Sequence, residues 1–290
     1  MNKLRQMFRF SKPATPGFGI SSGFYLMTFI PTTALPTPHQ LANPEGADGA
    51  EVGLIVPLEH GAVKTSLTQP MHVGSYGIVS PDKKSMLHMA ITNLGQSTGF
   101  DPRVAADTRE AGHLLSPEVR EVMRATWLIA QFKFKSHDAM VRPAIRQVYG
   151  LAARLAELTG GIVCDPLAQR YSMGPDARVS EDLYPSELLS FHERNGKLMT
   201  KGMSKFGLPE MSIAGYSEEN RERARETLEW CCLKFFRSLP LSVGDRPKGH
   251  NHTFMVVQDA DVPAGGYPTL ELIPHSATSV DEVLEDFFSA

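Results

Sequence analysis

Apolar side chains recur at helical spacing in two long stretches of the chain. In the first, residues 141–155, apolar positions share one face, while arginines and a glutamate fall elsewhere. Gly160 and Gly161 follow, and glycine readily adopts the left-handed conformation that ends a helix. The second stretch begins with the capping hydroxyl of Ser217 and places on one face Ala224, Leu228, Cys231 and Phe235. Both patterns predict amphipathic helices.

Alternating or wholly apolar runs predict strands between these helices. Residues 132–135, Phe-Lys-Phe-Lys, put aromatic rings on one side and ammonium groups on the other, as in a strand with one buried face. The pair Asn195-Gly196 lies between two patterned arms and predicts a tight hairpin. Further strands are predicted at 51–58, 86–94, 126–134, 161–165, 252–259 and 269–274.

The order of these elements predicts the fold class. From Trp127 onwards the chain reads strand, helix, strand or hairpin, helix, strand, which is the order of a ferredoxin-like β-α-β-β-α-β unit. We therefore predict an α+β fold with an antiparallel or mixed sheet that the N-terminal strands extend. A helix is also predicted at Ser116-Pro117, from its capping hydroxyl and proline, and a short acidic helix at 279–288.

Residues 1–50 differ in composition from the rest of the chain. Their first part is basic, because no acidic residue precedes Glu45, and residues 31–50 are rich in Pro, Ala, Gly and Thr. We interpret 1–50 as an N-terminal arm and linker, and 51–290 as a single α+β domain. The arm also has the composition of an export or transit signal, an alternative to the cytoplasmic location that we expect. Its apolar run "GFYLMTFI" is too short to span a bilayer.

Charge and cysteine content narrow the classes of function. The formal net charge of -3 gives no field that attracts polyanions, so we expect no nucleic-acid partner. The basic and aromatic residues near 132–146 are interpreted as the solvated side of one strand and one helix. Three cysteines, Cys164, Cys231 and Cys232, make no disulfide framework and favour a reducing compartment. We interpret all three as core residues.

The stretch "TKGMSKFGLPEMSI", residues 200–213, combines two glycines, a proline and a carboxylate. Gly202 and Gly207 permit a positive φ, and Pro209 favours an extended chain before it, so the residues predict a sharp return into the sheet. Glu210 follows this turn at the head of a strand. It is the candidate catalytic residue, as a base or metal ligand, and the alternative is a purely structural turn.

The same stretch carries a resemblance to known proteins. With the strand, helix and "GGIVCD" before it and a long helix after it, "GMSKFGLPEMSI" resembles a family of uncharacterised bacterial domains with a Gly-Met, Phe-Gly, Pro-Glu signature. The resemblance covers residues 127–258. It implies an α+β fold and, because that family has no established activity, no catalytic residue.

Two histidines form the candidate metal site. His250 and His252 lie two residues apart at the start of a predicted strand, so both imidazoles would point to one face. A divalent metal such as zinc needs further ligands, of which Asp165 is the best candidate because it ends a strand before a proline. His137, His192 and Glu210 are the other candidates. The alternative is a pair of polar residues in a glycine-containing loop.

No phosphate-binding loop, dinucleotide fingerprint or zinc-protease motif occurs in the chain. We therefore expect a non-catalytic binding or interaction protein with an unidentified protein partner, no required cofactor and no membrane span. The alternative hypothesis is a metal-dependent hydrolase that uses His250, His252 and Asp165, with Glu210 as a further candidate. Substrate and oligomeric state are not predicted.

Overall fold

The structure is a computed structural model that describes residues 18–42, 54–58, 67–96, 100–108, 115–137, 141–237, 239, 241–249, 251–260, 268–275, 277 and 279–287. The chain divides into two compact units, one of residues 20–190 and one of residues 1–19 with 191–290. The sequence predicted a single domain over 51–290. Both units combine helices with a sheet, so the α+β class is confirmed.

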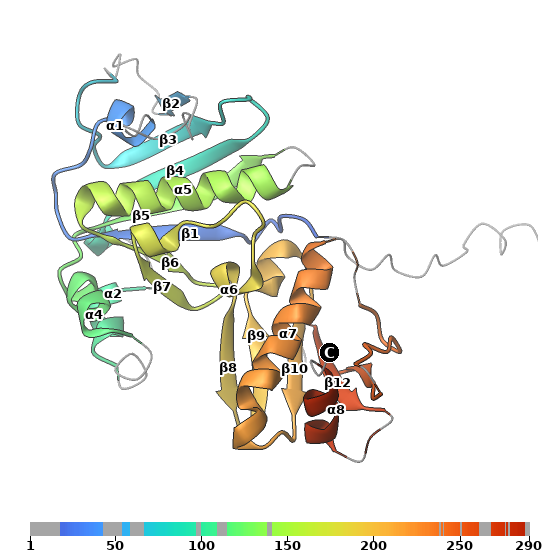
Figure 1. The fold of residues 1–290 in the computed structure, drawn as a ribbon. Coiled ribbons are helices and arrows are strands. Elements are labelled where there is room, and N and C mark those ends of the chain that lie inside the picture. Colours follow the sequence, from blue (N-terminus) through green and yellow to red (C-terminus); the bar gives the residue numbers. More distant parts are fainter. Residues whose placement is uncertain are drawn as a thin grey trace, which may run out of the picture. The chain divides into compact units, whose positions relative to one another are not determined.

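The unit of residues 20–190 is built on a seven-stranded sheet in the order β2-β3-β4-β5-β1-β6-β7 (Figure 1). All neighbouring strands are antiparallel. The strands are β1 (Tyr25–Ile30), β2 (Leu54–Pro57), β3 (Gly74–Val79), β4 (Met86–Asn93), β5 (Leu128–Ser136), β6 (Ile162–Asp165) and β7 (Arg170–Met173).

Helices cover both faces of this sheet. The Thr28 hydroxyl donates a hydrogen bond to the carbonyl of Ala152 on α5, which places α5 on the face of Leu26 and Thr28. On the opposite face, Phe29 packs with Val119 and Met123 of α4. The helical segments are α1 (Pro38–Ala42), η1 (Leu94–Gln96), α2 (Pro102–Ala106), α4 (Pro117–Arg124), α5 (Val141–Thr159), η2 (Pro175–Ala177) and α6 (Pro185–Leu188).

The cap signals in the sequence correctly predicted how α4 begins and how α5 ends. Ser116 accepts the N–H of Val119 at the start of α4, and α5 ends before Gly160, which has a φ of 66°. Gly161 then passes so close to β1 that a Cβ there would lie 2.3 Å from the carbonyl oxygen of Phe29. The α5–β6 connection therefore fixes the helix against the sheet.

The other unit has a five-stranded sheet in the order β11-β12-β10-β9-β8, in which β10 and β12 are parallel. Helix α7 packs on β9 and β10, and α8 packs on α7 and β12 (Figure 1). The segments are β8 (Ser190–Arg194), β9 (Lys197–Lys201), η3 (Met203–Phe206), β10 (Glu210–Ala214), η4 (Glu218–Asn220), α7 (Arg221–Phe236), β11 (Phe254–Gln258), β12 (Thr269–Pro274) and α8 (Val280–Phe287).

Two local predictions in this unit have different outcomes. Asn195 and Gly196 have φ values of 54° and 71°, as the central residues of a type I′ turn do, and β8 and β9 are neighbours, so the predicted tight hairpin is confirmed. The long helix begins at Arg221 rather than at Ser217, because residues 218–220 form a separate 3₁₀ turn.

The predicted ferredoxin-like unit is not confirmed, because its strands are divided between two sheets. β5 and β6 lie in the seven-stranded sheet, where β1 separates them, whereas β8, β9 and β11 lie in the five-stranded sheet. Most of the apolar run at 23–30, assigned to the arm from sequence, forms β1, an interior strand between β5 and β6. β1 pairs with β5 on one edge and with β6 on the other. It therefore occupies the position between them that the ferredoxin-like prediction gave to a strand of the later hairpin.

Candidate functional site

Glu210, the candidate catalytic residue, stabilises the turn that precedes it. Its side chain is 8% exposed, and the Thr200 hydroxyl donates to Oε2 at 2.8 Å. The backbone N–H groups of Gly202 and Ser204 donate to Oε1 at 3.0 and 3.2 Å. Burial raises the pKa of Glu210, and these hydrogen bonds oppose that shift. Because both oxygens accept bonds from the turn, the geometry supports a structural role.

Asp165, the proposed metal ligand on β6, is also engaged within its own unit. It is 2% exposed, and its two oxygens accept hydrogen bonds from the Tyr149 hydroxyl at 2.5 Å and the Ala168 N–H at 3.1 Å. Burial, followed by the neighbouring Asp165 charge, raises the pKa of Tyr149 well above its usual value. This pair ties α5 to the end of β6.

The structure describes only one of the two histidines of the proposed metal site. His250 lies outside the described residues. His252 belongs to the other compact unit from Asp165; its backbone N–H donates to Asp286 at 2.7 Å, and its Nδ1 is buried without a hydrogen-bond partner in the described chain. Among the described residues, no group of three or more His, Cys, Asp or Glu side chains is arranged to hold a metal ion.

The other sequence candidates show no common site. His137 follows β5, and its ring packs edge-on to Phe134 with centroids 5.5 Å apart, while His192 lies on β8 in the other unit. The three cysteines are buried and form no disulfide, as the core interpretation predicted. Burial raises the pKa of Cys231 to about 12, so this thiol is protonated at neutral pH and a poor nucleophile.

The structure reveals a site that sequence reasoning missed, in the unit of residues 20–190. A pocket of about 370 Å³ lies between the first half of α5, the loop from β3 to β4 and the segment after η2. This volume is within the range of about 300–1,000 Å³ typical of small-molecule sites. Its lining is Ser80, Pro81, Asp82, Ser85, Pro143, Arg146, Gln147, Gly150, Arg178 and Val179.

Helical spacing explains which part of α5 faces this pocket. Pro143, Gln147 and Gly150 lie three or four positions apart, so they share one side of the helix. Pro143 has no N–H and Gly150 has no side chain, so neither fills the pocket with a polar group. Arg146 borders the same side and is exposed, whereas Gln147 is only 6% exposed. Gln147 therefore lines the deeper part of the pocket, with its amide atoms covered, and the guanidinium of Arg146 lies nearer to solvent.

Gln147 is the residue that distinguishes the pocket. Both its Oε1 and its Nε2 are buried, and neither has a hydrogen-bond partner in the part of the chain that the structure describes. A primary amide has two donor hydrogens and an acceptor oxygen, and leaving buried polar atoms unpaired costs about 1–3 kcal/mol. Most buried polar side chains in folded proteins are paired. A bound molecule that offers a matching acceptor and donor would pair with both atoms of this amide.

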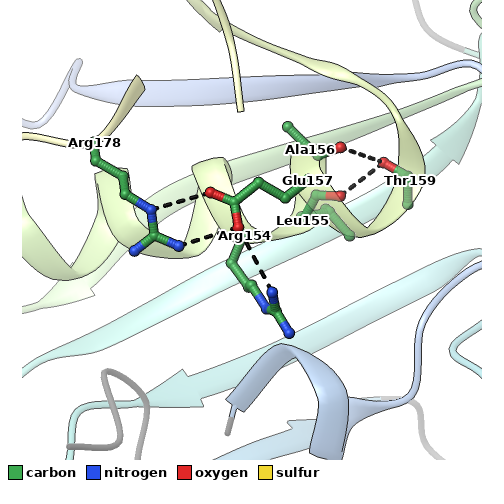
Figure 2. A network of polar contacts seen from close by, with 6 residues as sticks. All are labelled: Arg154, Leu155, Ala156, Glu157, Thr159 and Arg178. Carbon is green, nitrogen blue, oxygen red and sulfur yellow. Dashed lines mark hydrogen bonds and ion pairs between the residues drawn. The ribbon is translucent and has the colours of Figure 1, made fainter. Parts of the chain in front are cut away.

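An ion pair with α5 orients the guanidinium of Arg178 at the pocket. Arg178 Nε lies 3.0 Å from Oε1 of Glu157, and its second contact is 3.2 Å to Oε2, so the carboxylate holds it at two points (Figure 2). Arg154, one turn earlier on α5, contacts the same carboxylate at 3.6 Å. A partly exposed ion pair of this kind adds little to the stability of the fold, but its two parallel contacts fix the direction in which the guanidinium points.

The β3–β4 loop forms the opposite wall and is held by hydrogen bonds between its own residues. The Ser80 Oγ accepts the N–H groups of Lys84 and Ser85 and donates to Asp82 at 2.5 Å. That hydroxyl contact is the largest of the causes that lower the pKa of Asp82, so the carboxylate is charged at neutral pH. Among the described residues, the charged lining therefore consists of two guanidinium groups and one carboxylate.

A larger hollow, of about 580 Å³, lies on the other face of the same sheet. Its lining includes Gln131, Met27, Cys164 and Tyr171, which are paired neighbours across β5, β1, β6 and β7. No charged side chain lines it among the described residues, and none of the buried unpaired atoms belongs to it. Its geometry therefore points less clearly to a ligand.

Comparisons with known proteins do not identify this site. No protein-family model, curated protein or solved structure matches the chain. No helix in the described ranges is long and apolar enough to cross a bilayer.

The sequence contained one signal for the pocket. Gln147 lies three residues after Ala144 and four before Leu151, both buried, so it occupies the apolar side of an otherwise regular amphipathic helix. A polar residue at such a position needs a partner. The sequence alone does not show whether a neighbouring side chain or a ligand supplies it.

Proposed function

We propose that the protein is a non-catalytic binding protein that holds a small polar molecule in the pocket between α5, the β3–β4 loop and Arg178. The observation that carries this proposal is the buried and unpaired amide of Gln147. A ligand that pairs with this amide would offset the free-energy cost of burying it without a partner. The size of the pocket suits one small molecule better than a segment of a partner protein.

The lining favours binding over catalysis. Among the described residues around the pocket there is no histidine or cysteine, and the Ser80 hydroxyl and the Asp82 carboxylate are engaged within their own loop. Guanidinium and amide groups recognise and orient a ligand, whereas acid–base or nucleophilic catalysis needs a group that titrates or is activated. The proposal keeps the binding role expected from sequence and changes the kind of partner.

The test is a thermal-unfolding screen against a panel of neutral and charged polar metabolites. A ligand that binds only the folded state raises the melting temperature with its concentration. We expect at least one compound to stabilise the wild-type chain and to leave Gln147→Met unaffected. Gln258→Met is the matched control, because Gln258 lies outside the pocket and its amide donates to the carbonyl of Thr269. If no compound stabilises the wild type more than Gln147→Met, the proposal is wrong.

The metal-dependent hydrolase with His250, His252 and Asp165 stays a second hypothesis. The buried unpaired Nδ1 of His252 favours it, whereas the two hydrogen bonds to Asp165 do not. Elemental analysis of untagged protein tests it. A stoichiometric transition metal that is lost in His252→Ala would support this hypothesis, and a metal content unchanged by that substitution would contradict it.

A further inference from the structure

We infer that the ligand of this pocket carries an anionic group, a carboxylate or a phosphate, together with a planar edge that presents a hydrogen-bond donor beside an acceptor. This inference rests on the proposed function, because it assigns ligand chemistry to the same pocket. Two features of the lining lead to it: the unpaired amide at depth and the guanidinium groups nearer to solvent.

The amide specifies the planar edge. Gln147 carries Oε1 as an acceptor and Nε2 as a donor in one plane, and both are unpaired in the described structure. Neighbouring atoms cover both, so the ligand pairs with them when the side chain turns towards the pocket that it lines. A group that satisfies both must offer a donor and an acceptor side by side. Primary carboxamides and the edges of nucleobases have this arrangement, and bidentate pairing of glutamine with adenine is a known example. A hydrocarbon or a lone hydroxyl would leave one of the two atoms unpaired.

The guanidinium groups specify the anion. Arg146 has neither an ion pair nor a hydrogen bond among the described residues, and it is exposed beside Gln147 on the same helix. Arg178 is directed by Glu157 through two contacts. Guanidinium is suited to carboxylate and phosphate oxygens because its N–H groups form a planar fork.

The carboxylate in the lining does not reverse this preference. Asp82 Oδ1 already accepts from the Ser80 hydroxyl and from the N–H of Lys84, so it serves its own loop. Glu157 already compensates Arg178, so among the described lining residues the guanidinium of Arg146 is the excess positive charge. An anionic ligand would reduce that excess, and a cationic ligand would increase it.

The volume limits the size of the ligand. At about 370 Å³ the pocket is near the lower end of the usual range, so it suits one compact molecule rather than a dinucleotide. Two sources share the inferred chemistry. One is a nucleoside monophosphate, with a base edge and a phosphate, and the other is a small carboxylic acid that carries a primary amide.

Isothermal titration calorimetry on the full chain tests the inference with two matched pairs of probes: adenosine monophosphate against adenosine, and glutaramate against glutaramide. In each pair the planar edge is the same and only one member is anionic. We expect the anionic member of at least one pair to bind about tenfold or more tightly than its neutral partner. The pair that responds identifies the source.

Substitutions on α5 then assign the effect to residues. Arg146→Gln should remove most of the preference for the anionic member, and Gln147→Met should weaken both members of the responding pair. Arg142→Gln is the matched control, because Arg142 is on the same helix, lies outside the pocket lining and donates instead to the carbonyl of Asp182. It should leave both affinities unchanged. Added salt should weaken the anionic probe more than the neutral one.

Failure of this inference and failure of the proposed function give different results. If neither anionic probe binds, or if anionic and neutral members bind equally and Arg146→Gln changes neither, the inference is overturned. The proposed function still stands in that case if any compound of the metabolite panel stabilises the wild type and not Gln147→Met. If no compound in either experiment depends on Gln147, both are wrong.

Discussion

The turn at Glu210 and the pocket at Gln147 contain similar polar groups, yet they differ in how those groups are paired. Glu210 is 8% exposed and accepts hydrogen bonds from Thr200, Gly202 and Ser204, all within ten residues of it. Gln147 is 6% exposed, and its amide has no partner among the described residues. The two side chains are almost equally buried, but the carboxylate of Glu210 is hydrogen-bonded and the amide of Gln147 is not.

This difference separates polar groups that build the fold from those that await a ligand. A buried carboxylate that accepts three local donors has found its partners within the chain, so it needs no substrate to explain it. A buried amide with no partner lowers the stability of the free protein, and selection for binding is one way in which such a group is retained. The residue type alone does not distinguish the two cases, because the difference lies in the hydrogen bonds that each side chain makes.

The largest expected effect comes from removing the carboxylate of the paired region. Glu210→Ala leaves the Thr200 hydroxyl and two backbone N–H groups without their acceptor, so we expect the free energy of unfolding to fall by about 3 kcal/mol. Urea denaturation measures this loss. Glu210→Gln keeps an acceptor oxygen and should cost less. Equal stability of wild type and Glu210→Ala would show that the turn does not depend on the carboxylate.

A smaller effect is expected where the chain after β7 passes α5. A Cβ on Gly174 would lie 2.7 Å from Cγ and 2.8 Å from the backbone nitrogen of Glu157, the residue that orients Arg178. We expect Gly174→Ala to cost about 2 kcal/mol, because the added methyl group must displace backbone, and to reduce ligand binding as well. Gly95→Ala is the control, since a Cβ at Gly95 meets no atom within 4 Å. If the two variants unfold at the same urea concentration, the close approach is not a constraint.

The smallest effect concerns a third polar cluster, which is partly buried and in which Asp281 accepts from Ser217 and Asn220, 64 and 61 positions before it. Burial alone would raise the pKa of Asp281, but hydrogen bonds from Ser217 and Asn220 outweigh it and lower the pKa. A lowered pKa means that the carboxylate stabilises the fold above the pKa of the unfolded chain, near 4, and that this contribution is lost as the pH falls through the folded value.

The corresponding measurement compares the wild type with Asp281→Asn over a range of pH. We expect the variant to be less stable by no more than about 1 kcal/mol near neutral pH. The difference should shrink as the pH falls below about 4, because protonation then removes the same charge from the wild type. A difference in stability that is constant from pH 3 to pH 7 would contradict this account.

Local features of the fold were predictable because short-range chemistry determines them. The cap at Ser116, the end of α5 before Gly160 and the hairpin at Asn195-Gly196 each depend on residues adjacent in sequence. The division into two sheets was not predictable in this way. It depends on the insertion of β1 between β5 and β6, a pairing of residues about a hundred or more positions apart.

The candidate site was less accessible to sequence reasoning for the same reason. Glu210 and Asp165 were recognised as unusual carboxylates, but their partners, Thr200 and Tyr149, lie ten or more residues away and determine their roles. Gln147 lay within a helix whose apolar face was predicted, and its significance depends on an absence of contacts. Only a three-dimensional structure shows that a side chain has no neighbour to pair with.

The central claim is that the amide of Gln147 is unpaired in the free protein, and the stability of ligand-free Gln147→Met tests it most directly. Methionine matches glutamine in length and in helix propensity, so urea denaturation reports mainly the loss of the buried amide. We expect the variant to be more stable than the wild type by about 1 kcal/mol, whereas the control Gln258→Met loses stability. If Gln147→Met is less stable than the wild type, the amide is already paired in the free protein and the pocket needs no ligand.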